Sequence, residues 1–120
     1  MRKMDWRRVL SPVSLLILCI ALLITSFRTL KADELSFELS LKDHRFTPSE
    51  LTIPADKRVR LTIENLDRTA AEFESHDFKA EKVVPAGGEV SLYLGPLKPG
   101  SYSFFDDFRA SETRGTLIAK

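Results

Sequence analysis

Short runs in which apolar and polar residues alternate fill the chain from residue 35 to residue 119. A period of two places the apolar side chains on one face of a β-strand and the polar ones on the other. The runs cover 35–41, 58–64, 90–94 and 101–104, with a closing strand at 115–119, and turn formers such as Pro and Gly separate them. Short strands with this spacing predict an antiparallel β-sandwich or barrel. The polar segment from Ser75 to Glu81 is compatible with one helical turn.

The first 32 residues have a different character. Four basic residues among the first eight precede an uncharged stretch of 19 residues, from Val9 to Phe27. This pattern is typical of an export signal, and the stretch is also long enough for a membrane-spanning helix. We therefore predict a signal peptide or N-terminal membrane anchor at 1–32 and a folded domain at 33–120. Cleavage after Ala32 would leave a soluble periplasmic domain, whereas an uncleaved helix at 9–27 would anchor it to the inner membrane.

The charge balance of the folded part excludes some functions. The chain carries a formal net charge of +1, but residues 33–120 hold twelve basic residues against sixteen acidic ones. A nucleic-acid partner is therefore not expected, because such partners select basic surfaces. The same residues contain no Ser-His-Asp or Cys-His set, so no enzyme active site is recognisable and any catalytic role would be an accessory one.

Three local patterns resemble one family. They are Asp43-His44-Arg45-Phe46-Thr47-Pro48 with Leu51-Thr52-Ile53-Pro54-Ala55, then Glu72-Phe73-Glu74-Ser75 with Glu81-Lys82-Val83-Val84-Pro85-Ala86-Gly87, and finally Pro99-Gly100-Ser101-Tyr102-Ser103-Phe104-Phe105 with Asp107-Phe108. Together they resemble the cupredoxin-like proteins of bacterial iron uptake, among them the EfeO N-terminal domain and the small periplasmic partner of Ftr-type iron permeases. The resemblance implies a Greek-key β-sandwich that follows the signal or anchor helix. It also implies a membrane permease as partner.

Ligand chemistry decides which metal such a domain could hold. A type 1 copper site needs a cysteine, and the one cysteine of this chain, Cys19, lies in the N-terminal segment. The resemblance places Asp106 where electron-transfer cupredoxins carry that cysteine and Arg109 about where they carry a histidine. Glu72 and Glu74 are two residues apart, so on a strand they face the same side. With Asp106 and His76 they predict a site of oxygen and imidazole ligands, which suits iron, manganese or copper(II).

Two functions follow as hypotheses. In the first, the exported domain assists high-affinity iron uptake by binding, delivering or helping to oxidise iron for a membrane permease, without type 1 copper. In the second, the sandwich binds no metal and serves as a protein-interaction or assembly module at the membrane. The first rests on the carboxylates and the family resemblance, and the second on Arg109 and the missing cysteine.

Overall fold

The structure is a computed structural model that describes residues 11–13, 16, 17, 19 and 34–120. The chain divides into two units, 1–32 and 33–120, and each is described by itself. In the first unit, the described residues 12, 13, 16, 17 and 19 are helical and Cys19 is an exposed free thiol. None of the helices among the described residues has the length and apolarity that a bilayer crossing requires. Most of the predicted apolar helix at 9–27, and the predicted cleavage point at Ala32, lie outside the described residues.

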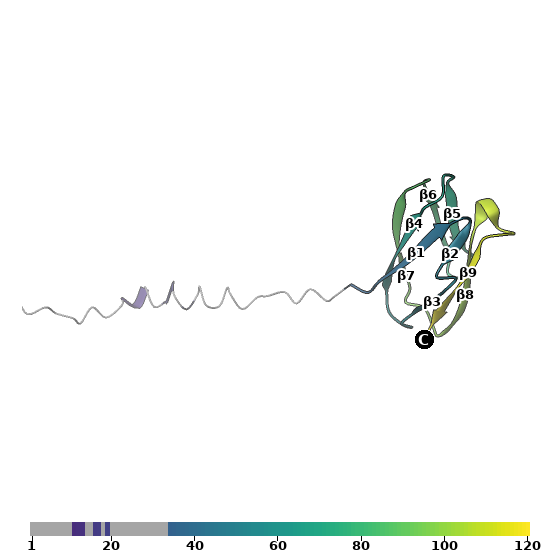
Figure 1. Cartoon of the computed structure of the whole chain (residues 1–120). Coiled ribbons are helices and arrows are strands. Elements are labelled where there is room, and N and C mark those ends of the chain that lie inside the picture. Colours follow the sequence, from purple (N-terminus) through teal and green to yellow (C-terminus); the bar gives the residue numbers. More distant parts are fainter. Residues whose placement is uncertain (1–10, 14–15, 18, 20–33) are drawn as a thin grey trace, which may run out of the picture. The chain divides into compact units, whose positions relative to one another are not determined.

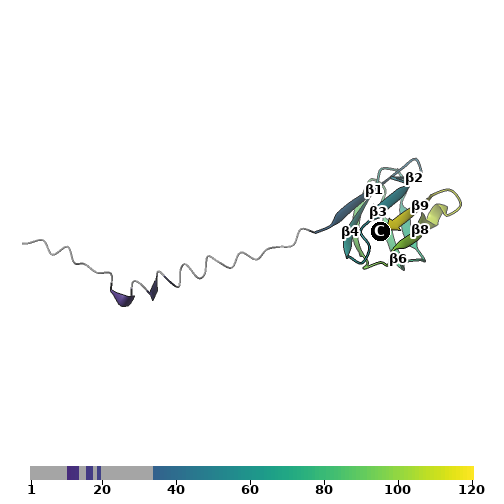
Figure 2. The ribbon, with the colours of Figure 1, turned by 90° about the horizontal axis from the view of Figure 1, so that it is seen from below.

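The second unit is a two-layered β-sandwich (Figures 1 and 2). Its strands are β1 (Ser36–Lys42), β2 (Arg45–Thr47), β3 (Glu50–Ile53), β4 (Val59–Asn65), β5 (Ala71–Ser75), β6 (Ala80–Val84), β7 (Glu89–Leu94), β8 (Gly100–Asp106) and β9 (Arg114–Ala119). One sheet has the order β2-β1-β4-β7 and the other the order β3-β9-β8-β5-β6. A single 3-10 turn, η1 (Asp107–Arg109), follows β8. The all-β sandwich expected from the sequence is confirmed.

Two details differ from the sequence-based expectation. The pairs β1–β4 and β3–β9 are parallel, so the sheets are mixed rather than purely antiparallel. The cause is that the chain repeatedly crosses from one sheet to the other, which brings strands of the same direction side by side. The helical turn considered at 75–81 is wrong, because these residues form the end of β5, a hairpin turn at 76–79 and the start of β6.

Aromatic side chains fill the centre of the sandwich. Phe46 packs edge-on against Phe73 and Phe104, with ring centroids 6.2 and 5.1 Å apart. The inward members of the alternating runs are almost fully buried around them, as Leu39, Leu61 and Leu117 show. The same alternation that buries Phe73 turns its neighbours on β5, Glu72 and Glu74, to the outer face.

Candidate metal site

Three carboxylates meet on the outer face of the sheet β3-β9-β8-β5-β6. Glu72 and Glu74 project from β5 on either side of the buried Phe73, and Asp107 opens the turn after β8. Carboxylate oxygens of the three residues lie within 4.8 Å of one another. This group, called the carboxylate cluster below, has the spacing that oxygen ligands around one cation require. Both glutamates are half-buried, whereas Asp107 is exposed.

Asp106, the ligand that the sequence predicted in this loop, points the opposite way. It pairs with Phe73 across β5 and β8, so its side chain faces the interior and is 1% exposed. Its Oδ1 accepts hydrogen bonds from the backbone N–H of Glu72 at 2.9 Å and of Phe108 at 3.1 Å. Asp106 thus caps η1 and ties that turn to β5. The structure brings Asp107 rather than Asp106 to the outward glutamates.

Negative charges surround Glu72. The pKa of Glu72 is raised, first because its side chain shares a hydrogen bond with Glu81, then because of partial burial and the negative charges of Glu81, Asp107 and Glu74. Glu81 faces Glu74 directly across the β5–β6 pair and therefore lies diagonally from Glu72. No Lys or Arg of residues 34–120 forms an ion pair with these four carboxyl groups. A bound cation would relieve their repulsion.

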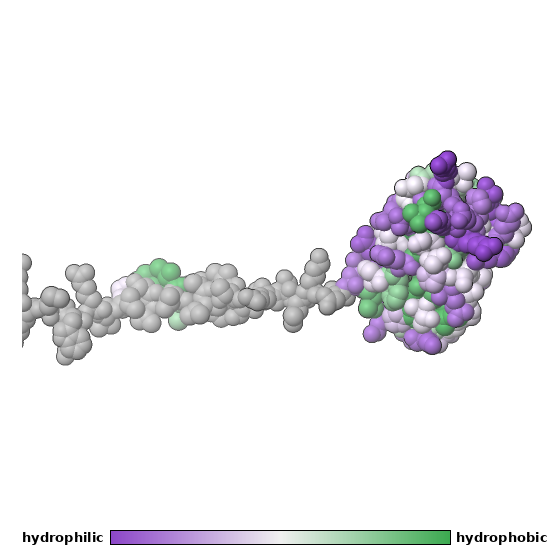
Figure 3. Space-filling view, in the orientation of Figure 1, coloured by the Kyte–Doolittle hydropathy of each residue, from purple (hydrophilic) through white to green (hydrophobic). Residues whose placement is uncertain are grey.

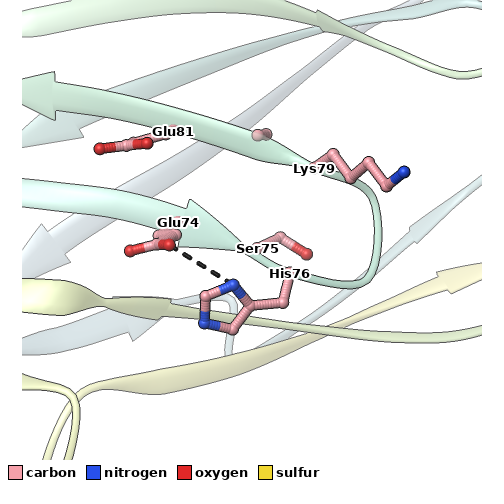
Figure 4. Close-up of a pocket in the computed structure, with 6 residues that line it drawn as sticks. Glu74, Ser75, His76, Lys79 and Glu81 are labelled. Carbon is pink, nitrogen blue, oxygen red and sulfur yellow. Dashed lines mark ion pairs between the residues drawn. The ribbon is translucent and has the colours of Figure 1, made fainter.

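His76 stands at the edge of the same face. Its Nδ1 lies 3.5 Å from Oε1 of Glu74, and its side chain is largely exposed. Figure 4 shows Glu74 and Glu81 side by side on adjacent strands, with the imidazole beside Glu74 and Lys79 turned away. These residues line a shallow pocket of about 280 Å³. His76 therefore reaches one glutamate of the carboxylate cluster, and the centre of its ring lies 5.2 Å from that of Phe105.

The hairpin that carries these side chains is anchored to β8. Asp77 Oδ2 accepts hydrogen bonds from the backbone N–H of Ser103 at 2.7 Å and from its hydroxyl at 3.1 Å. Both donors stabilise the ionised carboxylate and lower the pKa of Asp77. The buried hydroxyl of Ser75 donates to the carbonyl of Ser103 at 2.7 Å. These bonds fix the position of His76 and the end of β5.

His44, the other histidine of the sandwich, has a structural setting. It occupies the tight turn between β1 and β2, where its backbone N–H donates to Asp67 at 2.9 Å. Its carbonyl accepts a hydrogen bond from the hydroxyl of Thr113 at 2.7 Å. Its ring nitrogen lies 3.4 Å from the same aspartate. His44 therefore joins three loops, as expected for a turn residue.

A model of the cupredoxin-like domain family matches residues 15–119. The chain belongs to the cupredoxin-like domain family. An uncharacterized protein of Rickettsia prowazekii (strain Madrid E) is 40% identical over 84 residues, which make up 70% of this chain and 67% of that relative. The family membership agrees with the strand order and with the alternating runs of the sequence.

Solved structures share the cupredoxin fold at low identity. Auracyanin A, a "blue" copper protein from Chloroflexus aurantiacus, superposes with a TM-score of 0.61 at 10% identity, over 73% of this chain and 100% of that one. A chain of a heme-copper terminal oxidase dimer superposes with a TM-score of 0.59 at 17% identity, over 90% of this chain and 93% of its own. At such identities the likeness shows the fold alone.

The residues of this cupredoxin-like sandwich do not fit type 1 copper. That site needs a cysteine thiolate and two histidines around one ion. Residues 34–120 contain no cysteine. Of their two histidines, His44 is held in the β1–β2 turn and His76 in the β5–β6 hairpin. Asp106, at the position that the resemblance assigns to the cysteine, is engaged by two backbone N–H groups.

Two members of this face were not among the predicted ligands. Asp107 is adjacent to a predicted one, and it follows Asp106 where β8 ends and η1 begins. The sequence does not say which residue faces outward, because that depends on the pairing with β5. Glu81 joins the face only through the β5–β6 register, in which it stands opposite Glu74.

Proposed function

We propose that this cupredoxin-like protein is exported and assists high-affinity iron uptake by binding iron at the carboxylate cluster and delivering it to a membrane permease. The observation that carries the proposal is the convergence of Glu72, Glu74 and Asp107 within 4.8 Å on an accessible face. Ferrous and ferric iron both accept carboxylate oxygen and imidazole nitrogen, so His76 is a further candidate ligand beside Glu74. The absence of cysteine from the sandwich sequence directs the chemistry to such hard ligands.

The site suits transfer rather than storage. Three ligands on an outer face leave the remaining coordination positions of a cation open to water or to a receiving protein. Asp107 lies in an exposed turn next to Phe108, whose ring is 55% exposed. An open coordination sphere allows a partner's ligands to replace those of this protein one at a time. Delivery requires that binding be strong enough to load the site and weak enough to release it.

Thermal unfolding in the presence of metal tests the binding step. A ligand that binds only the native state raises the melting temperature in proportion to the logarithm of its concentration. We expect ferrous iron under anaerobic conditions, and manganese or copper(II) in separate experiments, to raise the melting temperature of the wild-type chain. The double variant Glu72→Gln/Glu74→Gln should lose this response. No shift in the wild type with any of these ions at millimolar concentration would refute the binding step.

A matched control separates the cluster from the general charge of the protein. Glu38 and Glu64 are exposed on β1 and β4 of the other sheet, so Glu38→Gln/Glu64→Gln removes the same charge at a distant place. This variant should keep the metal response of the wild type. If both double variants lose it equally, the effect is one of net charge, and the carboxylate cluster is not the site.

A second candidate function has its own supporting observation. Two exposed apolar side chains flank the carboxylate cluster: Val83, which pairs with Glu72 across β5–β6, and Phe108, which follows Asp107. Apolar groups beside charges are common in protein interfaces, so the face could serve a metal-free interaction module. Iron-dependent growth of cells that carry Glu72→Ala/Glu74→Ala distinguishes the two functions. Lost growth with an intact fold supports iron delivery, and unchanged growth supports the interaction module.

A further inference from the structure

The end of the sandwich away from the carboxylate cluster gathers exposed basic side chains. Three segments meet there: the loop 54–58, the turn 95–99 and Lys120 at the end of β9. Backbone hydrogen bonds join these segments: the N–H of Asp56 donates to the carbonyl of Leu97 at 2.7 Å, and the N–H of Ala55 donates to the carbonyl of Lys120 at 3.3 Å. We call the exposed side chains of Lys57, Arg58, Lys98 and Lys120 the basic pole. Figure 2 views the sandwich from this end, where the C terminus lies.

The charges of the basic pole are free of ion pairs. Within residues 34–120, none of its four cationic groups forms an ion pair with a carboxylate. The acidic residues nearby are Asp56 in the same loop and Glu34, and Glu34 is engaged by Arg60 at 3.7 Å and by the hydroxyl of Tyr93 at 2.6 Å. Cations thus outnumber anions at this end, and their side chains are exposed on loops that backbone hydrogen bonds join.

The basic pole also has an aromatic and apolar border. The guanidinium of Arg58 lies 4.0 Å from the ring centre of Tyr93, whose side chain is half exposed. Leu35, at the entry to β1, is exposed as well. Figure 3 shows a hydrophobic area low on the sandwich, on the side where Figure 1 draws β1 and β7. Cationic groups next to an amphipathic aromatic ring are typical of protein surfaces that rest at a lipid headgroup layer.

The chain enters the sandwich at the end that carries the basic pole. Glu34 accepts a hydrogen bond from the Tyr93 hydroxyl and forms an ion pair with Arg60 at the same end of the sandwich. Residue 34 therefore lies beside the basic pole. Only six residues, 28–33, separate Glu34 from the apolar run 9–27, and they include Arg28 and Lys31. Fully extended, that linker spans at most about 25 Å. An anchored chain therefore keeps the basic pole within reach of the bilayer surface.

From these observations we propose that the basic pole docks on a membrane surface of anionic phospholipids. The occupant is the headgroup layer itself, whose negative charge matches the free cations of the pole and whose interface accommodates Tyr93. The seven-residue strand β8 separates Lys98 from Asp107, a rise of about 20 Å. Docking would thus hold the carboxylate cluster about that far above the lipid. The proposal does not depend on the nature of the cargo at the cluster.

Fluorescence quenching in nanodiscs tests the docking with the full chain. In a Cys19→Ser background, a fluorophore is attached either to Ser101→Cys, at the start of β8 beside the pole, or to Glu112→Cys, in the loop before β9 at the other end. A nitroxide on the lipid headgroup serves as quencher. With discs that contain phosphatidylglycerol, the label at position 101 should be quenched several-fold more than the label at 112. Phosphatidylcholine discs, or high salt, should abolish the difference.

A charge-matched pair of variants identifies the surface. Lys57→Gln/Arg58→Gln/Lys98→Gln removes three charges from the basic pole, and Lys42→Gln/Arg45→Gln/Arg68→Gln removes three exposed charges from the opposite end. The first variant should reduce quenching at position 101 to its value in phosphatidylcholine discs, and the second should leave it unchanged. Equal quenching in the two kinds of disc, or an equal effect of the two variants, would overturn the proposal. Melting curves establish that each variant is folded.

Discussion

The direction in which single side chains point decides what the outer face of β5 can bind. Asp106 and Asp107 are chemically identical neighbours, yet one is buried under two backbone N–H donors and the other is exposed beside Glu72 and Glu74. The first stabilises the turn and the second offers its oxygens to a ligand. Such a division of roles is testable with one substitution at each position.

We expect Asp106→Ala to destabilise the fold and Asp107→Ala to leave it intact. Removing the buried Asp106 carboxylate leaves the part-buried N–H groups of Glu72 and Phe108 without their acceptor, which costs about 1–3 kcal/mol. Removing Asp107 deletes only an exposed side chain. Chemical denaturation measures the free energy of unfolding of both variants. The assignment of roles is contradicted if Asp107→Ala is the less stable of the two.

Metal titration of the same pair gives the complementary result. Asp107→Ala should weaken the response of the melting temperature to iron, because it removes one of the three clustered ligands. Asp106→Asn keeps an oxygen acceptor for the two N–H groups and should retain both the fold and the metal response.

Glu72 provides a prediction with a defined pH dependence. Its pKa is raised in the folded protein, so ionisation costs more there than in the unfolded chain. Below the ordinary pKa of glutamate the group is protonated in both states. As the pH rises through the raised pKa of Glu72, the folded wild type loses stability relative to a variant that has no ionisable group at position 72.

Glu72→Gln should therefore melt at a higher temperature than the wild type at neutral pH, and at the same temperature in acid. Its amide can still donate a hydrogen bond to Glu81. The same variant should bind iron more weakly, because it loses a carboxylate ligand. Melting curves across the pH range, with and without metal, measure both effects. A variant less stable than the wild type at neutral pH would show that repulsion does not dominate at this position.

At the scale of the strands, the close packing of β9 against β8 depends on Gly115, which has no side chain. Gly115 on β9 pairs with Phe104 on β8, and a Cβ at Gly115 would overlap the Phe104 ring. That ring is fully buried and contacts both Phe46 and Phe73, so it has little room to move. Close packing between adjacent strands therefore excludes even a methyl group here.

Gly115→Ala should lower the free energy of unfolding by about 1–3 kcal/mol, the usual cost of overpacking a core. Gly100→Ala is the matched control, since a Cβ at Gly100 meets its nearest neighbour, the Tyr102 ring, at an ordinary 3.7 Å. Denaturant titrations of the two variants provide the measurement. Equal free energies of unfolding for the two variants would mean that the Phe104 ring moves aside without an energetic cost.

At the scale of the whole molecule, the sandwich contains everything that its core requires. All members of the buried cluster lie between Leu39 and Ala119. Both sheets, with their two parallel pairs, are complete within residues 36–119. Folding of the sandwich should therefore not require the preceding 32 residues.

A fragment of residues 33–120 should fold by itself in one cooperative transition. Its melting temperature should match that of the sandwich in the full chain, because the fragment keeps every residue of the buried core among the described residues. Circular dichroism at a β-sheet wavelength measures both transitions. A fragment that unfolds over a broad range, or that melts well below the full chain, would show that the N-terminal segment contributes to the fold.

The sequence alone determined which side chains share a strand face. The period-two pattern predicted β1, β4, β7, β8 and β9, and the spacing of Glu72 and Glu74 placed both on one side of a strand, because alternation follows from the backbone of a single strand. The position of the one cysteine outside the folded part also excluded type 1 copper without any coordinates.

Only the tertiary structure decided which residues of different strands meet. The register of β5 with β8 buried Asp106 and brought Asp107 to the glutamates, and the register of β5 with β6 added Glu81. The contacts between loop 54–58, turn 95–99 and Lys120 assembled the basic pole in the same way. Register and loop contacts depend on how the whole core packs, and a slip of one residue would reverse every face. That information is absent from any single stretch of sequence.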